Sequence, residues 1–181
     1  MNILDTNIPE VKIIEPAVFG DARGFFFESF NEQKFQAATQ VNLPFVQDNH
    51  SRSSKGVLRG LHYQIERAQG KLVRVVSGAV IDVAVDLRRS SPTFKQWVAV
   101  ELSADNHRQL WVPPGFGHGF VVISETADFL YKTTDYWFKE HERAVRWDDP
   151  TLAVDWGYTG EVSLSAKDMD APYLADAELF E

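Results

Sequence analysis

Apolar and polar residues alternate through the middle of the chain, which predicts a protein built mainly of β-strands. Between Leu72 and Leu87 the odd-numbered positions are mostly apolar, while the even-numbered positions include Arg74, Asp82 and Asp86. A period of two is typical of strands with one buried face. Ser77-Gly78 interrupts this alternation with a turn signal, so the segment predicts two strands separated by a turn.

Further short strands are predicted on both sides of a Pro-Pro-Gly turn at 113–115. The alternation resumes in Lys95–Leu102, and apolar segments follow at Leu110–Val112, Gly119–Ile123 and Phe129–Thr133. Many short strands with little helix favour a β-sandwich, barrel or jelly roll. The chain has no internal repeat, low-complexity segment or linker, so residues 1–181 are predicted to form one domain.

The N-terminal part gives mixed signals. Asn31–Gln40 predicts a short surface helix with Asn31 as its N-cap, whereas Val11–Ile14 and Phe25–Phe30 are rich in β-forming residues. The three consecutive phenylalanines at 25–27 cannot all face one side of a strand. One face must therefore meet a second apolar surface, such as a partner subunit or a ligand. The alternative is an ordinary sandwich strand that is buried on both sides.

Composition narrows the possible functions. The chain contains no cysteine, which excludes disulfides, thiolate nucleophiles and Cys-ligated zinc. It lacks both a long apolar stretch and a basic segment followed by an apolar block, so we predict neither a membrane span nor a signal peptide, and expect a cytoplasmic location. The net charge of -8 argues against nucleic acid as a partner. An anionic ligand would require cations gathered locally at its site.

Two histidines lie in segments suited to chemistry. His62 follows Gly60 by two residues, so both would face the same side of a strand, and the glycine would leave room for a ligand to approach. An imidazole is well suited to act as a base near neutral pH. The alternative for His62 is a packed histidine without a chemical role. His118 ends a Pro-x-Gly-x-x-His segment that begins at Pro113 and directs the ring from the start of a strand.

Three aromatic residues near the end of the predicted strands are also candidates. Tyr131 has a phenol that could donate a proton to a carbanion, unless it only packs at the mouth of a barrel. Tyr136 and Trp137 offer flat faces on which a base could stack. Core packing is the alternative for both.

Ser165 to Asp168 allows two interpretations. The spacing fits a capping box for a short C-terminal helix, and local sequence favours this reading. The same segment could deliver Lys167 to a phosphate and Asp168 to a histidine. A carboxylate in that position would fix the tautomer of the imidazole and raise its basicity.

The segment from Pro113 to His118 resembles the second motif of the cupin superfamily, whose fold is a jelly roll or double-stranded β-helix. Cupins often bind a metal through a His-x-His pair and a Glu in their first motif. The corresponding positions here are His62 and Gln64, so three nitrogen or oxygen ligands are hard to assemble. We predict no metal site, which leaves metal-free acid–base chemistry or simple binding.

Blocks along nearly the whole chain together resemble the dTDP-4-dehydrorhamnose 3,5-epimerases. In order, the blocks are Asp21-x-Arg23-Gly24-x-Phe26-x-Glu28, Gln47-Asp48-Asn49-His50-Ser51, Arg59-Gly60-Leu61-His62-Tyr63-Gln64, Gln69-Gly70-Lys71-Leu72-Val73-Arg74, Pro113-Pro114-Gly115-Phe116-x-His118-Gly119-Phe120 and Tyr131-Lys132-x-Thr134. No single block is distinctive, but their combination in this order is very specific. The resemblance implies a mainly β, cupin-like jelly roll, a homodimer, and neither a metal nor an organic cofactor.

The resemblance also implies a reaction: dTDP-4-dehydro-6-deoxy-D-glucose is converted into dTDP-4-dehydro-L-rhamnose. The C4 ketone acidifies the hydrogens on C3 and C5, so removing one gives an enolate, and returning a proton on the other face inverts the centre. By analogy His62 is the base, Asp168 orients its ring, Tyr131 is the acid on the opposite face, and Lys71 stabilises the enolate oxygen.

The residues that the resemblance assigns to substrate binding would hold the sugar, diphosphate and thymidine. They are Arg23, Phe26, Glu28, Gln47, Asn49, Arg59, His118, Tyr136, Trp137, Glu142 and Lys167. Among these and the catalytic set, Arg23, Arg59, Lys71 and Lys167 are the local cations that an anionic ligand requires.

Three alternatives stay open at this point. Close relatives invert only C5 or only C3, and they keep the His–Asp pair and a similar barrel. A non-catalytic sugar-nucleotide-binding cupin would keep the arginines and aromatics but could lose His62 or Tyr131, and both are present here. A metal-dependent cupin oxygenase or isomerase would be sensitive to chelators.

Overall fold

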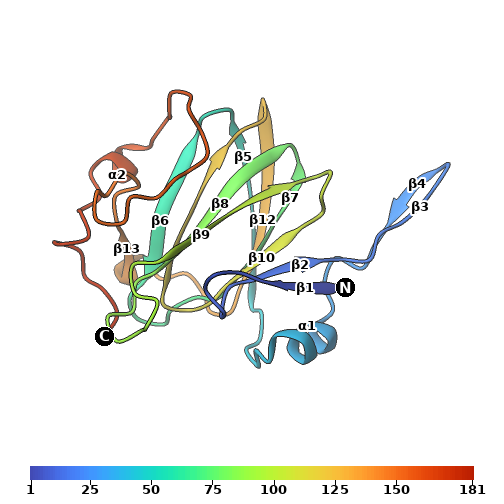
Figure 1. Ribbon diagram of the computed structural model, residues 1–181, viewed down its shortest axis with the longest axis horizontal. Helices are drawn as coiled ribbons and strands as arrows, with labels where there is room; N and C mark the ends of the chain where they lie inside the picture. Colours follow the sequence, from blue (N-terminus) through green and yellow to red (C-terminus); the bar gives the residue numbers. More distant parts are fainter.

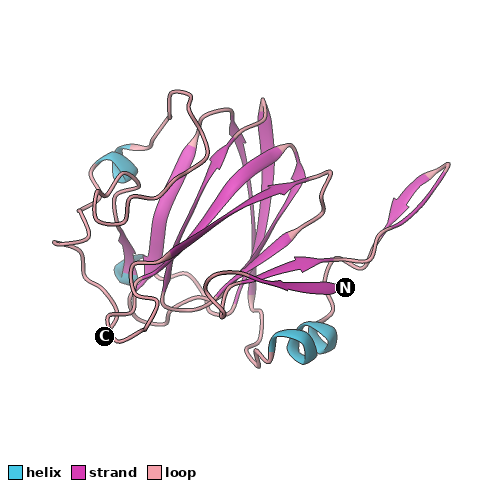
Figure 2. Cartoon of the chain, in the orientation of Figure 1, coloured by secondary structure: helices cyan, strands magenta, loops and turns pink.

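Two antiparallel sheets fold over each other into a barrel in the computed structural model, which describes residues 1–181 (Figures 1 and 2). The first sheet has the order β1 (Asn2–Asp5), β2 (Lys12–Glu15), β10 (Gln109–Val112), β7 (Lys71–Ser77), β12 (Thr126–Thr133) and β5 (Gln47–Ser54). The second has the order β13 (Glu142–Ala144), β6 (Leu58–Gln64), β11 (Phe116–Val122), β8 (Ala79–Asp86) and β9 (Trp97–Ser103). Most neighbouring strands are distant in sequence, as in a jelly roll, and the predicted mainly β, cupin-like fold is confirmed.

The predicted strands are present, with some shifted boundaries. β7 and β8 are separated at Gly78, whose φ is 75°, and a Cβ there would lie 1.9 Å from the carbonyl oxygen of Thr126. The turn therefore requires glycine. β9 begins at Trp97 rather than Lys95, because Lys95 has a φ of 72° and cannot continue a strand. β11 and β12 both begin earlier than the alternation predicts.

β8 differs from the prediction of one buried face, because both of its faces are buried. Val80 and Ala84 face the core between the two sheets, whereas Val83 and Val85 pack into a second apolar cluster on the outer side of the second sheet. Asp82 is 0% exposed. The cover on the outer side comes from the C-terminal part of the chain, which carries no strand pattern of its own.

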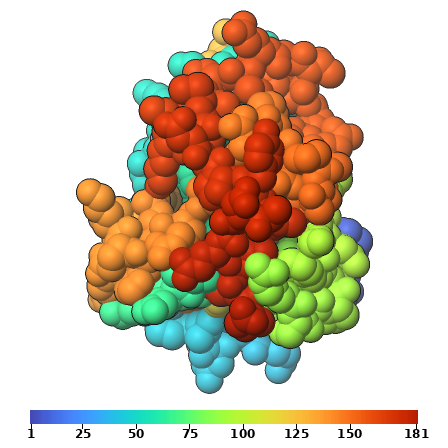
Figure 3. All heavy atoms as spheres, turned by 90° about the vertical axis from the view of Figure 1, so that its left-hand side faces the viewer, coloured from blue at the N-terminus to red at the C-terminus, as the bar shows by residue number.

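Residues 145–181 form this cover, which we call the C-terminal segment. Leu152, Trp156, Leu174 and Leu179 contribute to the second cluster. Figure 3 shows the segment, in red and orange, spread over the face of the molecule that lies at the left of Figure 1. It contains α2 (Ala166–Met169) and follows the short 3-10 helix η1 (Lys139–His141) and β13. No helix in the protein has the length and apolar character needed to cross a membrane, and the cytoplasmic location stays a prediction.

Helix α1 (Glu32–Thr39) confirms the predicted N-terminal helix. The side chain of Asn31 caps it by accepting a hydrogen bond from the amide of Lys34 at 3.0 Å. The helix lies on the surface as expected, but Phe35 is buried against Ile14, Leu72 and Trp111. This single anchor seats the helix on the outer face of the first sheet.

β3 (Phe19–Asp21) and β4 (Gly24–Phe26) form a hairpin that projects from the barrel (Figure 1). We call residues 16–29 the arm. Phe19, Phe25 and Phe26 are 67%, 64% and 70% exposed, so the alternative of a sandwich strand buried on both sides is wrong. The segment predicted to form a strand, Phe25–Phe30, is also shorter than expected. The strand ends at Phe26, beyond which the chain pairs with no other strand.

Candidate active site

A cavity of about 310 Å³ opens between the two sheets and collects most of the predicted catalytic residues. Its walls combine two phenylalanine rings and a glycine with several titratable or polar side chains. The lining residues are Asn49, His50, Ser51, Arg59, His62, Lys71, His118, Gly119, Phe120, Phe129 and Tyr131. A few convergent polar groups on an otherwise packed scaffold are the usual form of a small-molecule site.

His62 on β6 is paired with Asp168 of α2 through a hydrogen bond of 2.5 Å between Nε2 and Oδ1. The other carboxylate oxygen of Asp168 accepts a hydrogen bond from the hydroxyl of Ser165 at 2.7 Å. Ser165 also caps α2 by accepting from the amide of Asp168 at 3.1 Å. The cap and the contact between Asp168 and a histidine are therefore both present in one short helix. Delivery of Lys167 to a phosphate stays a prediction.

This pair leaves His62 with one nitrogen free to act as a base. Burial raises the pKa of Asp168, but the hydrogen bonds from His62 and Ser165 and the attraction of His62 outweigh it, so the net shift is below the usual value. The ionised carboxylate accepts, which fixes the proton of a neutral His62 on Nε2. Nδ1 then keeps its lone pair, as the orienting carboxylate of a catalytic triad ensures for its histidine.

Gly60 serves a different purpose from the one predicted. A Cβ at this position would lie 2.5 Å from Cα of Gly119 and 3.0 Å from the carbonyl oxygen of His118. The missing side chain thus makes room for the backbone of β11 rather than for a ligand. The close approach of β6 and β11 brings His62 into register with His118.

Tyr131 and Lys71 face the cavity from the opposite sheet. Burial, reinforced by the charge of Glu142, raises the pKa of Tyr131, so its phenol keeps its proton at neutral pH. Desolvation lowers the pKa of Lys71 to about 8, against the attraction of Asp82 and Glu142. The cavity therefore holds a neutral acid and a cation on one wall, and a histidine–carboxylate pair on the other.

His118 forms a second buried histidine–carboxylate pair, which sequence reasoning identified only in part. Its Nε2 lies 2.9 Å and 3.1 Å from the two carboxylate oxygens of Asp82 on the neighbouring strand β8. Burial lowers the pKa of His118 and raises that of Asp82. Asp82 was recognised only as a polar position in an alternating strand. One signal could have identified it: Asp82 is a carboxylate within a run of valine, isoleucine and alanine, a composition typical of a buried strand.

Gln64, at the position where cupins often carry a second metal-binding histidine, has its side chain engaged elsewhere. Its amide is buried and makes hydrogen bonds to Arg67, Tyr136 and Phe138. No group of three His, Asp or Glu side chains is arranged so that it could hold a metal ion. The metal-free site stays a prediction.

Eight of the predicted binding residues lie in or near the cavity, including His118, which lines it. Asn49 and Arg59 line it, and Arg59 also donates to the hydroxyl of Ser53 at 3.0 Å. Gln47 donates to Asn49 at 3.1 Å and accepts from the amide of Trp137 at 3.2 Å. Tyr136 and Trp137 are 54% and 52% exposed in the loop after β12.

Glu142 and Lys167 form an ion pair with 2.6 Å between Oε1 and Nζ. Glu142 is aligned with Gln64 across β13 and β6, and Lys167 precedes Asp168 in α2. The pair thus connects the strand beside the cavity with the helix that carries Asp168.

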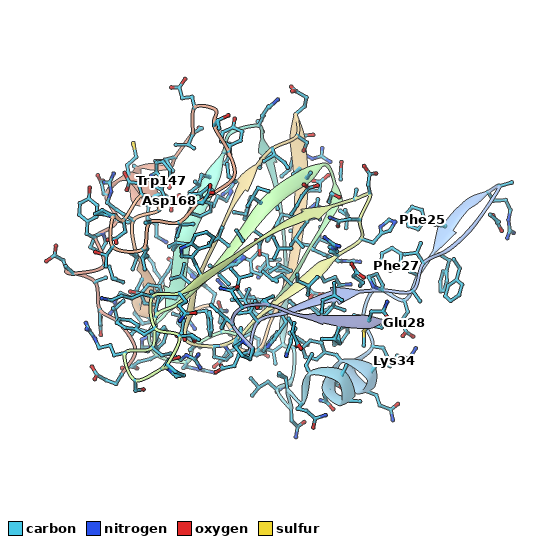
Figure 4. The ribbon with its side chains drawn as sticks, viewed as in Figure 1. Phe25, Phe27, Glu28, Lys34, Trp147 and Asp168 are labelled. Atoms are coloured by element: carbon cyan, nitrogen blue, oxygen red, sulfur yellow. The ribbon has the colours of Figure 1, made fainter.

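Three predicted binding residues are not brought to the cavity. Arg23 and Phe26 lie on the arm, where the Arg23 side chain is 90% exposed and pairs with Asp21. Glu28 pairs with Lys34 at 2.7 Å. Figure 4 shows Glu28 and Lys34 at the base of the arm, on the opposite side of the barrel from Asp168. Within one chain, these residues and the His62–Asp168 pair do not form a single site.

The chain is similar to proteins of one family over almost its whole length. Residues 5–176 match the family described as dTDP-4-dehydrorhamnose 3,5-epimerase. A dTDP-4-dehydrorhamnose 3,5-epimerase of Pseudomonas aeruginosa is 61% identical over 173 residues, which cover 96% of each chain.

Solved structures agree with this family match. A 3,5-epimerase of Legionella pneumophila, solved in complex with dTDP-4-keto-L-rhamnose, superposes with a TM-score of 0.95 at 55% identity, covering 97% of this chain and 93% of that one. A 3'-monoepimerase of Streptomyces bikiniensis, solved with dTDP-quinovose, has a TM-score of 0.88 at 33% identity, covering 94% and 87%.

Proposed function

The chain belongs to the dTDP-4-dehydrorhamnose 3,5-epimerase family, and from this premise we propose that it inverts C3 and C5 of dTDP-4-dehydro-6-deoxy-D-glucose to give dTDP-4-dehydro-L-rhamnose. The observation that carries the proposal is the placement of His62 and Tyr131 in one cavity, on strands of opposite sheets. Inversion needs a base on one face of the sugar and an acid on the other, and this arrangement supports both roles. We propose that residues 1–181 act as one domain.

In the proposed mechanism, Nδ1 of His62 removes a proton from the carbon beside the C4 ketone. Asp168 stabilises the imidazolium that results, because its ionised carboxylate lies 2.5 Å from Nε2. The ammonium group of Lys71 stabilises the negative charge that develops on the ketone oxygen. The phenol of Tyr131 then returns a proton on the other face, which leaves an imidazolium and a phenolate. Once His62 has released its proton to solvent and Tyr131 has taken one up, the same sequence acts at the second centre.

Incubation of the protein with dTDP-4-dehydro-6-deoxy-D-glucose in D2O, followed by NMR, tests this function directly. We expect deuterium at both C3 and C5 of the product and L-rhamno stereochemistry. Absence of any exchange would reject an enzymatic role and favour a sugar-nucleotide-binding cupin. The same incubation with a chelator present tests the metal-dependent alternative, since the proposed mechanism predicts an unchanged rate.

Deuterium at one carbon only would support the single-centre alternative. The monoepimerase of Streptomyces bikiniensis keeps a similar fold, so the fold does not distinguish the two activities. The higher identity to the Pseudomonas and Legionella 3,5-epimerases, 61% and 55% against 33%, supports double inversion.

The proposed role of Lys71 predicts a loss of activity at alkaline pH. Lys71 carries its charge below its pKa of about 8, and the charge is lost as the pH rises through this value. We expect kcat at saturating substrate to fall along this limb. In Lys71→Met the rate should be about 100-fold lower and should lack the limb, since the cation proposed to stabilise the enolate oxygen is gone. An alkaline limb that persists unchanged in the variant would assign it to another group.

We also propose that the protein is a homodimer in which the arm reaches the partner. Phe19, Phe25 and Phe26 form an exposed apolar surface on the arm, and burial against a second chain would remove it from water. Arg23, Phe26 and Glu28 could then serve the partner's cavity, which they do not reach in their own chain. Sedimentation equilibrium should give twice the chain mass of 20.5 kDa. A monomeric mass at the concentration used for activity would contradict the proposal.

A further inference from the structure

A buried side-chain amide holds the loop that carries Tyr136 and Trp137. We call residues 134–138 the rim loop. Gln64, the last residue of β6, accepts a hydrogen bond from the amide of Phe138 at 2.8 Å and donates to the carbonyl of Tyr136 at 3.1 Å. It also donates to the carbonyl of Arg67 at 2.8 Å. A primary amide suits this position because it can accept and donate twice at once.

The hydrogen bonds from Gln64 reach both peptide groups that flank Trp137. The carbonyl of Tyr136 belongs to the peptide before Trp137, and the amide of Phe138 belongs to the peptide after it. A second glutamine, Gln47, accepts from the amide of Trp137 itself at 3.2 Å. The Trp137 backbone is thus held on both sides, while its ring stays half exposed.

Contacts on the exposed side of the protein also hold the rim loop. Arg67 forms two hydrogen bonds to the carboxylate of Asp135, at 3.0 Å and 2.7 Å. Its guanidinium also lies over the Phe138 ring, 4.2 Å from the centroid. Gln69 donates to the carbonyl of Asp135 at 2.8 Å. The rim loop is therefore fixed from inside by Gln64 and from outside by Arg67.

The rim loop adjoins the cavity at two points. Gln47, which holds Trp137, also donates to Asn49 in the cavity wall. Thr134 accepts from the amide of Gly70 at 2.8 Å, next to Lys71. Neither Tyr136 nor Trp137 lines the cavity that contains His62 and Tyr131. A ligand with its reacting carbons in that cavity could place a more distant group on the aromatic rings.

We propose that Gln64 is a positioning residue that presents Trp137 as a platform for the base of the nucleotide, and that it acts on binding rather than on proton transfer. The inference rests on the proposed function. It assigns a use to the position where other cupins often bind metal, namely the rigid presentation of an aromatic face. A loop that is already ordered before the ligand binds loses less conformational entropy when it binds the base.

The test compares two inhibitors that share the diphosphate but not the base. Turnover by the wild type and by Gln64→Met is measured with dTDP and with inorganic pyrophosphate as competitive inhibitors. Methionine is close to glutamine in size but makes none of its hydrogen bonds. We expect KM and the inhibition constant of dTDP to rise about tenfold, with kcat within about twofold and the inhibition constant of pyrophosphate unchanged.

Arg67→Ala is a second variant, which removes the contacts on the exposed side of the loop, where the Arg67 side chain is 50% exposed. It should shift the same two constants in the same direction by a smaller factor. Thr6→Val is the matched control, because the hydroxyl of Thr6 also holds a loop through hydrogen bonds to the backbone, of Ile8 and Val11, and lines no part of the cavity. This control should change none of the constants.

The outcomes separate the inference from the function on which it rests. Wild-type protein without any turnover would contradict the proposed function. With an active wild type, equal weakening of dTDP and pyrophosphate in Gln64→Met would overturn the platform role, as would a fall in kcat at unchanged dTDP affinity. Unchanged constants in both Gln64→Met and Arg67→Ala would also overturn it.

Discussion

Replacing His62 with alanine should lower turnover by about 100- to 10,000-fold, the range that a general acid–base group contributes. The other two histidines that line the cavity do not replace the His62 ring, because His50 is already paired with Asp128 and His118 with Asp82. The loss should appear equally in deuterium exchange and in product formation, since both require the first proton to leave. NMR of the substrate in D2O measures the two rates in one sample.

His141→Ala provides the control for this variant. His141 is a partly buried histidine near Glu66 that lines no part of the cavity, so its loss should leave both rates close to those of the wild type. Deuterium exchange at a near-normal rate in His62→Ala would show that His62 is not the base. Circular dichroism and thermal unfolding of the variant exclude loss of the fold as the reason for inactivity.

Replacing Tyr131 with phenylalanine should separate proton removal from inversion. His62 would still form the enolate and could return a deuteron from solvent to the face it came from. Inversion needs a donor on the opposite face, and the phenol of Tyr131 is the partly buried acid in that wall. We expect product formation to fall by about 100-fold or more, while deuterium still enters the recovered substrate at a readily measured rate.

Tyr63→Phe is the matched control for this second variant. Tyr63 is a buried tyrosine whose pKa, like that of Tyr131, is raised by desolvation, but its hydroxyl donates to the carbonyl of Glu178 and lines no part of the cavity. Its loss should affect stability more than turnover. If exchange and product formation fell together in Tyr131→Phe, the division of roles between Tyr131 and His62 would be wrong.

The elements predicted from the sequence depend on local patterns. The alternation in β7 and β8 and the Asn31 cap of α1 each involve a few consecutive residues, so they could be read without knowledge of the fold. The two buried faces of β8 could not, because the cover comes from residues 145–181, which have no periodic pattern. The environment of the arm could not be predicted for the same reason, because a run of phenylalanines does not show which surface the rings contact.

The candidate active site could be predicted mainly because the sequence resembles a known family. Local patterns indicated His62, Tyr131 and a possible carboxylate at Asp168 as candidates. They gave no reason to place residues so distant in sequence in one site. The function of Gly60 was predicted wrongly because it depends on the backbone of β11, a strand that no local pattern pairs with β6. Asp82 was overlooked because its partner, His118, lies 36 positions later in the chain.

The distance of 106 residues between His62 and Asp168 has a consequence for synthesis of the protein. A ribosome releases the strand with His62 well before it makes α2, so the early chain holds an imidazole that nothing orients. The C-terminal segment must also arrive to pair its Ser163 backbone with Gly56 and Leu58, at the start of β6. The proposed catalytic pair can therefore form only after residue 168 has been made, and a chain cut before α2 would lack the carboxylate that orients His62.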